Sequence, residues 1–154
     1  MPGTPISLRL QFLREQSRTM PPTQATPGSA GLDLRAALDV PNLTIAPGAR
    51  AAIPTGIAIE IGQPGVAGFV FSRSGLGAKH GLTVAQGVGV IDPDYRGEIM
   101  VWLLNTSSEP RTVANGERIA QLVLLPVFSP VIQVVEELGD TSRGAGGFGH
   151  TGRV

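Results

Sequence analysis

The stretch that decides the fold class is EIMVWLL, residues 98–104, because every residue after Glu98 in it is apolar. A strand with one face in water alternates apolar and polar residues, whereas a strand covered on both faces does not. A second run of this kind, IAQLVLLPV, occupies residues 119–127. We therefore predict two strands covered on both faces, as in the core of a β-sandwich or at a subunit interface.

Short apolar stretches separated by turn residues make up most of the remaining chain. Residues 6–12 and 57–61 alternate with the strand period of two, and residues 68–71 predict a further strand. Asn115-Gly116 is a hairpin signal, and glycine (21) and proline (13) reach nearly twice their usual share of about 12%. The pattern predicts one short helical turn, around residues 74–79. The expected fold is therefore all-β, a β-sandwich or jelly roll with one short helix.

Composition narrows the function classes. Of 154 residues, 42% are hydrophobic, which suits one compact domain with a sizeable core. Only 16% are charged, against about 25% in an average soluble domain, which is a weak hint of surface hidden between copies of the chain. Lysine plus arginine equal aspartate plus glutamate at 12 each, so the basic footprint of a non-specific nucleic-acid binder is excluded.

Several kinds of site are excluded by residues that the sequence lacks. It has no cysteine, hence no disulfide, thiolate metal site or cysteine nucleophile, and its two histidines make a His-rich zinc site improbable. Residues 1–18 show no signal-peptide pattern, and no apolar run approaches the roughly 20 residues of a membrane span. We expect a soluble cytoplasmic protein without nucleic-acid or membrane partners.

Two segments carry side chains suited to phosphate or metal. Asp33 and Arg35 fall on one face of a predicted strand, which is either a solvated face or a place where Asp33 accepts hydrogen bonds from water on Mg²⁺. SRSGLG, residues 72–77, closes a strand and opens the helical turn. There Arg73, Ser74 and free backbone amides could bind an anion, although Ser74 could equally cap the turn.

Two further segments place polar groups beside apolar strands. GVGVIDPDYRGE, residues 87–98, has the composition of an ordinary hairpin, but Asp92 follows an apolar run and could orient a water. Tyr95 could contact a sugar. In GERIAQ, residues 116–121, Gln121 lies inside an apolar strand, where its amide bonds either to backbone or to a ligand phosphate.

The C-terminal stretch, residues 140–154, is rich in glycine and almost without aliphatic residues, which predicts a mobile arm after a β domain at 1–139. Its G-x-G-x-x-G match is false because no strand precedes it. Arg143 and Phe148 are the exceptions in this arm. They suit a phosphate and a base, respectively, although a plain disordered tail needs neither.

The strings AGLDLRA, SRSGLG, GVGVIDPDYRGE, GERIAQ and RGAGGFGHTG stand in the order and spacing of the five motifs of trimeric dUTP pyrophosphatases. From about Leu8 to Gly152 the sequence resembles this family, the dUTPases. The resemblance implies a distorted jelly roll of the β-clip type and a homotrimer in which each active site draws on three chains. It also implies Mg²⁺-assisted hydrolysis of dUTP to dUMP and pyrophosphate, which limits uracil incorporation into DNA and supplies dUMP for dTMP synthesis.

The resemblance also implies a role for each candidate residue. Asp92 would be the general base that holds the attacking water, and Asp33 would contact Mg²⁺ through water. The phosphate-binding residues would be Arg73, Ser74, Gly75, Gln121 and Arg143. The residues binding uracil and deoxyribose would be Gln86, Gly89, Val90, Ile91, Tyr95 and Phe148.

Specificity would come from the hairpin. Backbone groups between Gln86 and Ile91 would bind the uracil edge, and Tyr95 would leave no space for a ribose 2′-hydroxyl, while Phe148 stacks on the base as the arm closes. Gln86, Ser72 and His150 stand where the family commonly has Asn, Pro, and Ser or Thr.

Three alternatives are open at this point. A dCTP deaminase relative shares the fold, but uses a Glu base in a differently arranged pocket. A non-catalytic nucleotide-binding trimer would be expected to lack the base, and Asp92 is present. A β-sandwich binding domain unrelated to nucleotides leaves Arg143 and Phe148 unexplained.

Overall fold

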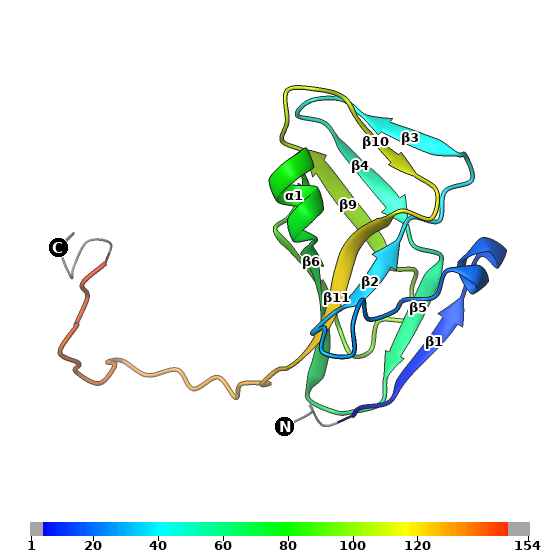
Figure 1. Cartoon of the computed structure of the whole chain (residues 1–154). Coiled ribbons are helices and arrows are strands. Elements are labelled where there is room, and N and C mark those ends of the chain that lie inside the picture. Colours follow the sequence, from blue (N-terminus) through cyan, green and yellow to red (C-terminus); the bar gives the residue numbers. More distant parts are fainter. Residues whose placement is uncertain (1–4, 148–154) are drawn as a thin grey trace.

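The computed structural model describes residues 5–147, and β-strands dominate it (Figure 1). The strands are β1 (Leu8–Phe12), β2 (Leu32–Arg35), β3 (Asn42–Ile45), β4 (Arg50–Pro54), β5 (Ile57–Ile61), β6 (Val66–Ser72), β7 (Leu82–Val84), β8 (Val88–Ile91), β9 (Met100–Asn105), β10 (Arg111–Ala114) and β11 (Arg118–Pro126). The helices are the 3₁₀ helix η1 (Glu15–Thr19) and the α-helix α1 (Ser74–His80). The predicted all-β fold with one short α-helix is confirmed.

The strands form two sheets and two ribbons, and all neighbours are antiparallel. One sheet has the order β2-β11-β6-β8 and the other β4-β9-β7, while β1 pairs with β5 and β3 with β10. In Figure 1 the β3–β10 ribbon lies at one end of the molecule and the β1–β5 ribbon at the other. The four-stranded sheet matters most for function, because three of the predicted motifs lie on its strands and a fourth lies where β6 ends.

The hairpin predicted at Asn115-Gly116 is wrong. The two strands that this turn joins do not pair with each other, since β10 pairs with β3 whereas β11 pairs with β2 and β6. The turn bonds instead to the segment after β2: Gly116 N donates to Ala36 O, and Asn115 Oδ1 accepts from Leu38 N. An Asn-Gly signal fixes a tight turn, but it does not decide which strands become neighbours.

The run at residues 98–104 is covered on one face only within a single chain. Val101 and Leu103 of β9 are buried in the core, whereas Met100 and Trp102 are 40% and 48% exposed. The run at 119–127 is better covered, since Ile119, Ala120 and Leu122 are buried. The prediction of coverage on both faces therefore holds for the first part of β11 and not for β9 in the isolated chain.

Helix α1 ends where the chain needs a glycine. Gly81 has φ = 70° and donates its N–H to Gly77 O, as in a left-handed helix cap. A Cβ at this position would lie 2.9 Å from Cβ of Ser107, so space as well as φ requires glycine. This turn sends the chain into β7, while the start of α1 lies beside the end of β6 because only Arg73 separates them.

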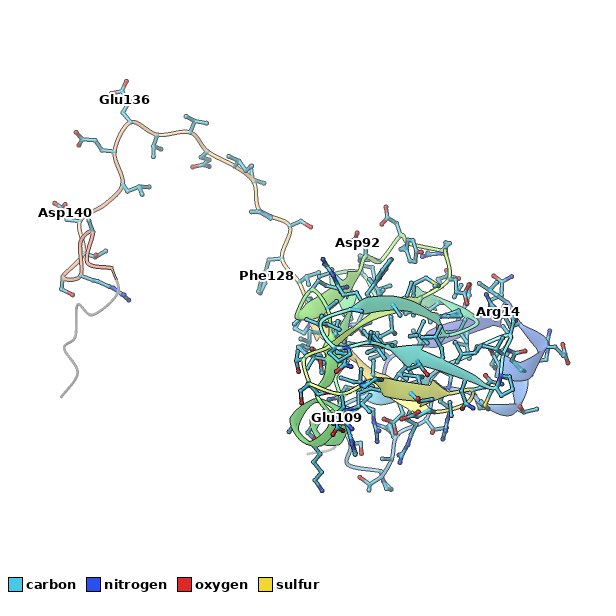
Figure 2. All side chains as sticks on the ribbon, turned by 90° about the horizontal axis from the view of Figure 1, so that it is seen from above. Arg14, Asp92, Glu109, Phe128, Glu136 and Asp140 are labelled. Atoms are coloured by element: carbon cyan, nitrogen blue, oxygen red, sulfur yellow. The ribbon has the colours of Figure 1, made fainter. Side chains whose placement is uncertain are left out.

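The chain leaves the β domain after β11. Between residues 127 and 147 the structure contains no helix or strand, and this segment extends away from the body (Figures 1 and 2). It exposes six large apolar side chains, among them Phe128 at 96% and Val134 at 94%. The boundary at 139/140 stays a prediction, although the last described strand ends at Pro126. Among residues 5–147, no helix is long and apolar enough to cross a membrane.

Candidate active site

A buried aspartate between two arginines forms the first part of the site. Asp33 lies on β2, is 8% exposed, and pairs in register with Gln121 of β11. Its Oδ1 accepts from Arg73 Nε and its Oδ2 from Arg118 NH1, each at 3.0 Å. Arg73 comes from the junction of β6 and α1, and Arg118 from the start of β11. We call these three residues the arginine cluster.

The arginine cluster carries one negative charge and two positive charges. Arg73 also donates to Arg118 O at 3.2 Å, which ties the two cationic segments together. Side-chain exposures of 28% for Arg73 and 41% for Arg118 leave part of each guanidinium open to solvent. An excess of positive charge in a fixed geometry suits a phosphate, which guanidinium groups bind through paired hydrogen bonds.

Three further residues predicted to bind phosphate lie around the same junction. Gln121 Nε2 donates to Ser72 O at 3.2 Å, and its side chain needs Gly31, where a Cβ would lie 3.0 Å from Oε1. Ser74 and Gly75 are exposed on the first turn of α1. A Cβ at Gly75 would meet nothing within 4 Å, so the backbone there is open to a ligand.

The structure does not bring the arm to this junction. Arg143 Nε donates to Gly146 O at 2.9 Å within the arm, which extends away from the β domain (Figure 1). Phe148 lies outside the described residues. The predicted roles of both residues remain predictions.

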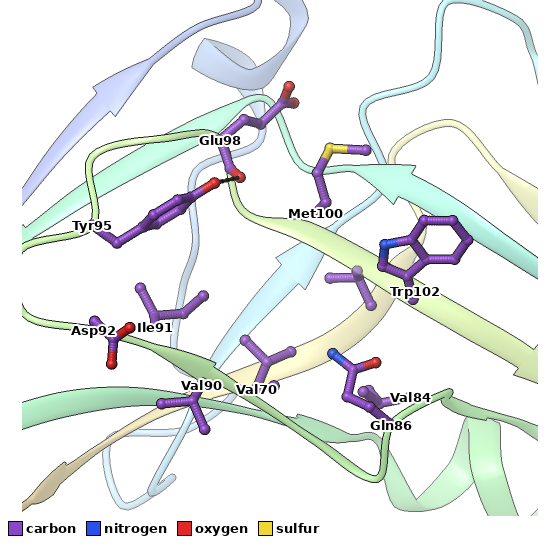
Figure 3. Close-up of a pocket in the computed structure, with 12 residues that line it drawn as sticks. Val70, Val84, Gln86, Val90, Ile91, Asp92, Tyr95, Glu98, Met100 and Trp102 are labelled. Atoms are coloured by element: carbon purple, nitrogen blue, oxygen red, sulfur yellow. Dashed lines mark hydrogen bonds between the residues drawn. The ribbon is translucent and has the colours of Figure 1, made fainter.

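The second part of the site is a pocket of about 210 Å³ beside β8 and β9 (Figure 3). The pocket brings together the predicted residues that belong to neither the arginine cluster nor the arm, and it includes part of the exposed face of β9. The predicted residues in its lining are Gln86, Gly89, Val90, Ile91, Asp92 and Tyr95. The other lining residues are Met100 and Trp102 of β9, together with Val70, Val84, Glu98 and Val101. Asp92 is exposed at the pocket's edge, and within the described chain no group donates a hydrogen bond to its carboxylate. A carboxylate in this state is free to accept a proton from water.

The loop after β8 closes on itself through Tyr95. Its N–H donates to Asp92 O at 3.1 Å, and its hydroxyl donates to Glu98 O at 3.0 Å (Figure 3). Gly97 makes room for the ring, because a Cβ there would lie 2.6 Å from Tyr95 Cζ. The sequence of this loop therefore places a rigid aromatic ring beside Asp92.

The two parts of the site lie far apart in one chain. Asp33 is in register with Gln121, Gln121 with Phe71, and Phe71 with Val88. Asp92 lies four residues further along, so it is about 13 Å away along the strands and about 14 Å away across them. Asp92 and the arginine cluster are therefore not neighbours within one chain.

Comparisons with known proteins agree with the motifs. A family model described as dUTPase matches residues 18–152. The chain belongs to the dUTPase family. The deoxyuridine 5′-triphosphate nucleotidohydrolase of Desulfitobacterium hafniense (strain DSM 10664 / DCB-2) is 52% identical over 147 residues, covering 96% of this chain and 97% of the relative. That of Shewanella amazonensis is 49% identical over 149 residues, covering 97% of each.

Solved dUTPases share the fold. The dUTPase of Staphylococcus bacteriophage 80alpha with dUPNHPP has a TM-score of 0.80 and 28% identity, covering 95% of this chain and 98% of that one. The dUTPase of Streptococcus mutans has a TM-score of 0.69 and 28% identity, covering 79% and 98%. The fold is therefore the β-clip jelly roll of dUTPases, as the sequence predicted.

The dUTPase family is in general Mg²⁺-dependent, and the residues of this chain fit a metal that comes with its substrate. Among residues 5–147, no three His, Asp or Glu side chains come together to hold a metal ion. Mg²⁺ is often held by one or two carboxylates together with substrate phosphates. Asp33 is the carboxylate beside the predicted phosphate residues, and because both its oxygens already bond to arginines, contact through water suits it.

Sequence reasoning missed three charged residues of this dUTPase. Arg118 lies in the GERIAQ string, but no role was predicted for it. An arginine just before an apolar strand was a signal in the sequence that could have marked it as a candidate site residue. Glu98 and Arg14 gave no signal, because 84 residues separate them in the chain. Hydrogen bonding to Asp39 and the nearby charge of Glu98 raise the pKa of Arg14, so this guanidinium stays charged at any working pH.

One departure from the common family pattern has a local explanation. Ser72 stands where the resemblance leads us to expect proline, and its hydroxyl accepts a hydrogen bond from Val84 N at 2.8 Å. This bond joins β6 to β7 just before Arg73. The backbone carbonyl of Ser72 also accepts a hydrogen bond from Gln121 of β11. Ser72 therefore bonds to both β7 and β11 next to the arginine cluster.

Proposed function

We propose that this chain is a dUTP diphosphatase that hydrolyses dUTP to dUMP and pyrophosphate. The observation that best supports this proposal is the contrast between two carboxylates. Asp33 accepts hydrogen bonds from two arginines, whereas Asp92 faces a pocket and its carboxylate accepts no hydrogen bond within the described residues. Family membership and curated relatives named deoxyuridine 5′-triphosphate nucleotidohydrolase support this reaction. They do not favour a dCTP deaminase or a non-catalytic nucleotide-binding module.

Binding begins at the pocket. The backbone of Gly89, Val90 and Ile91, with Gln86, binds the uracil edge, and the ring of Tyr95 packs against the deoxyribose. Wrong bases are rejected because they leave buried polar groups of the hairpin without partners. Tyr95 excludes a 2′-hydroxyl because its backbone N–H is held by Asp92 O and its ring hydroxyl by Glu98 O.

Hydrolysis proceeds by one in-line displacement. Asp92 orients a water and takes its proton while the water oxygen bonds to the α-phosphorus. The bond from the α-phosphorus to the bridging oxygen breaks, and pyrophosphate leaves with that oxygen. Arg73, Ser74, Gly75 and Gln121 hold the phosphates. Asp33 would help to hold Mg²⁺ through water beside the triphosphate, and the ion would supply charge neutralisation there.

The active site is shared between copies of the chain in a homotrimer. The separation of Asp92 from the arginine cluster supports this, because one triphosphate needs both. A pocket of about 210 Å³ is also below the roughly 300 Å³ at which ligand sites begin. The exposed apolar side chains of β9 and of residues 128–138 supply surface for contacts between subunits.

The arm completes the site on a neighbouring subunit. Arg143 binds the γ-phosphate and Phe148 stacks on uracil when the arm closes, which excludes bulk water from the reacting atoms. Cytoplasmic location remains a prediction from sequence.

The test is pyrophosphate release from dUTP, dTTP, dCTP and UTP with Mg²⁺, with the oligomeric state followed by sedimentation. We expect turnover of dUTP alone by a trimer. Ammonia release from dCTP would favour the deaminase alternative, and dUTP binding without turnover would favour the binding module. Turnover of several nucleotides would contradict the specificity assigned to the hairpin.

A further inference from the structure

The loop that carries Asp92 and Tyr95 is tethered to the β domain at Glu98. Its Oε1 accepts from the backbone N–H of Gly56 at 2.7 Å and from Arg14 Nε at 3.2 Å. Glu98 is partly buried, with 23% of its side chain exposed. The end of the loop thus bonds to two segments distant in sequence, the chain after β1 and the turn before β5.

Both donors are themselves fixed in place. Gly56 has φ = 68°, and a Cβ there would clash with the hydroxyl of buried Ser17, so only glycine fits this turn. Arg14 is held from its other side by Asp39, whose two carboxylate oxygens each accept from NH1 at 2.9 Å. A carboxylate with two preset donors has little freedom to move.

The position of Glu98 is transmitted directly to Tyr95. The Tyr95 hydroxyl donates to the backbone oxygen of Glu98 itself (Figure 3), and the ring packs over Gly97. The peptide group of this Glu98 oxygen is also held from the other side, because Ile99 N donates to Ile57 O at 2.9 Å. Releasing the Glu98 side chain would therefore remove one of two supports of the Tyr95 acceptor. The ring would then be held less firmly at the distance from the pocket on which exclusion of a 2′-hydroxyl depends.

We propose that Glu98 is a positioning residue whose bonds to Gly56 and Arg14 hold the Tyr95 ring and thereby set the preference for deoxyribose over ribose. This inference rests on the proposed function. It assigns specificity to a residue that need not contact the nucleotide, and to its ion pair with Arg14, which joins the end of the loop to the chain after β1.

The experiment compares kcat/KM for dUTP and UTP in wild type, Glu98→Ala and Glu98→Gln. The alanine variant loses both tethers, and we expect the UTP-to-dUTP ratio to rise about tenfold. The glutamine variant keeps an acceptor for Gly56 but loses the charge that faces Arg14, so we expect a rise of about threefold. The matched control is Asp39→Asn, which removes an exposed charge beside Arg14 but keeps a side-chain oxygen that can accept from Arg14 NH1, so Arg14 and the Glu98 tether stay in place. Its ratio should stay within about twofold.

Binding provides a readout independent of turnover. Trp102, the only tryptophan, lines the pocket, so its fluorescence can follow the imido analogues of dUTP and UTP. We expect weaker discrimination between the two in both Glu98 variants.

The outcomes separate the two proposals. A wild type that binds the dUTP analogue without hydrolysing dUTP refutes the proposed reaction, while the binding ratios still test Glu98. A Glu98→Ala protein that melts earlier with unchanged ratios shows a merely structural residue and overturns the inference. If Glu98→Ala does not fold by circular dichroism, Glu98→Gln decides, and an unchanged ratio there overturns the inference.

Discussion

Asp33 and Asp92 lie on opposite edges of the four-stranded sheet and in opposite electrostatic surroundings. Asp33 is buried within β2, and two guanidiniums occupy both of its oxygens. Asp92 follows β8, is exposed, and has no hydrogen-bond donor on its carboxylate within residues 5–147. The comparison teaches that an aspartate has a structural role where the fold supplies hydrogen-bond donors to both of its oxygens. Where the fold supplies none, the same side chain remains available for proton transfer.

The largest effect separates these roles at Asp92. Asp92→Asn keeps size and shape but cannot accept the proton of water, so we expect kcat for dUTP to fall by about 10²- to 10⁴-fold. Unfolding free energy should change by no more than about 0.5 kcal/mol, because the side chain is exposed. Pyrophosphate release and urea unfolding measure the two quantities. A variant that retained most of its turnover would remove Asp92 from the role of base.

A mixing experiment tests whether Asp92 and the arginine cluster act from different chains. Asp92→Asn and Arg73→Gln proteins should each be almost inactive. After unfolding and refolding together, random trimers should recover about a quarter of wild-type activity, because a site with intact Asp92 from one chain and intact Arg73 from another then forms. Each variant refolded alone is the control. No recovery in mixed trimers would mean that both residues serve one site from the same chain.

Asp33→Asn, unlike Asp92→Asn, should lower the stability of the protein as well as its turnover. The amide leaves two arginines without their counter-charge, and because both guanidiniums are partly exposed, losing the charge-assisted hydrogen bonds should cost about 1.5 kcal/mol. We expect an earlier urea midpoint with an unchanged slope, together with reduced turnover. Stability equal to wild type would show that the arginine cluster contributes nothing to folding and would undo the contrast with Asp92.

The smallest effect concerns the pocket wall. Gln86 lines the pocket, and a Cβ at Gly89 would be 3.4 Å from its Nε2, so the side chain lies against the β8 backbone. Gln86→Asn introduces the residue that the resemblance leads us to expect here, and one improved hydrogen bond should lower KM for dUTP about threefold. kcat should not change, because Asp92 is untouched. A larger KM would show that this chain uses the longer side chain.

Local patterns predicted much of the fold. Alternation in residues 57–61 predicted β5, and the SRSGLG string predicted α1. The motif strings predicted that Asp33, Arg73 and Gln121 belong to one site, and the structure brings them together around one junction. The 3₁₀ helix at residues 15–19 was not predicted, because five residues are too few to show a period. The pairing partners of β10 and β11 were not predictable either, because a turn sequence controls the local bend and not the choice among several apolar edges.

By itself, the sequence determined the fold class, the family and the residue types at the site, since these depend on period, turn chemistry and local strings. Only the tertiary structure decided that Asp33 is held by two arginines, that Glu98 meets Gly56 and Arg14, and that Asp92 lies about 13 Å along and about 14 Å across the sheet from Asp33. The physical reason is that charge pairing and distance depend on strand order and register, which arise from packing the whole core.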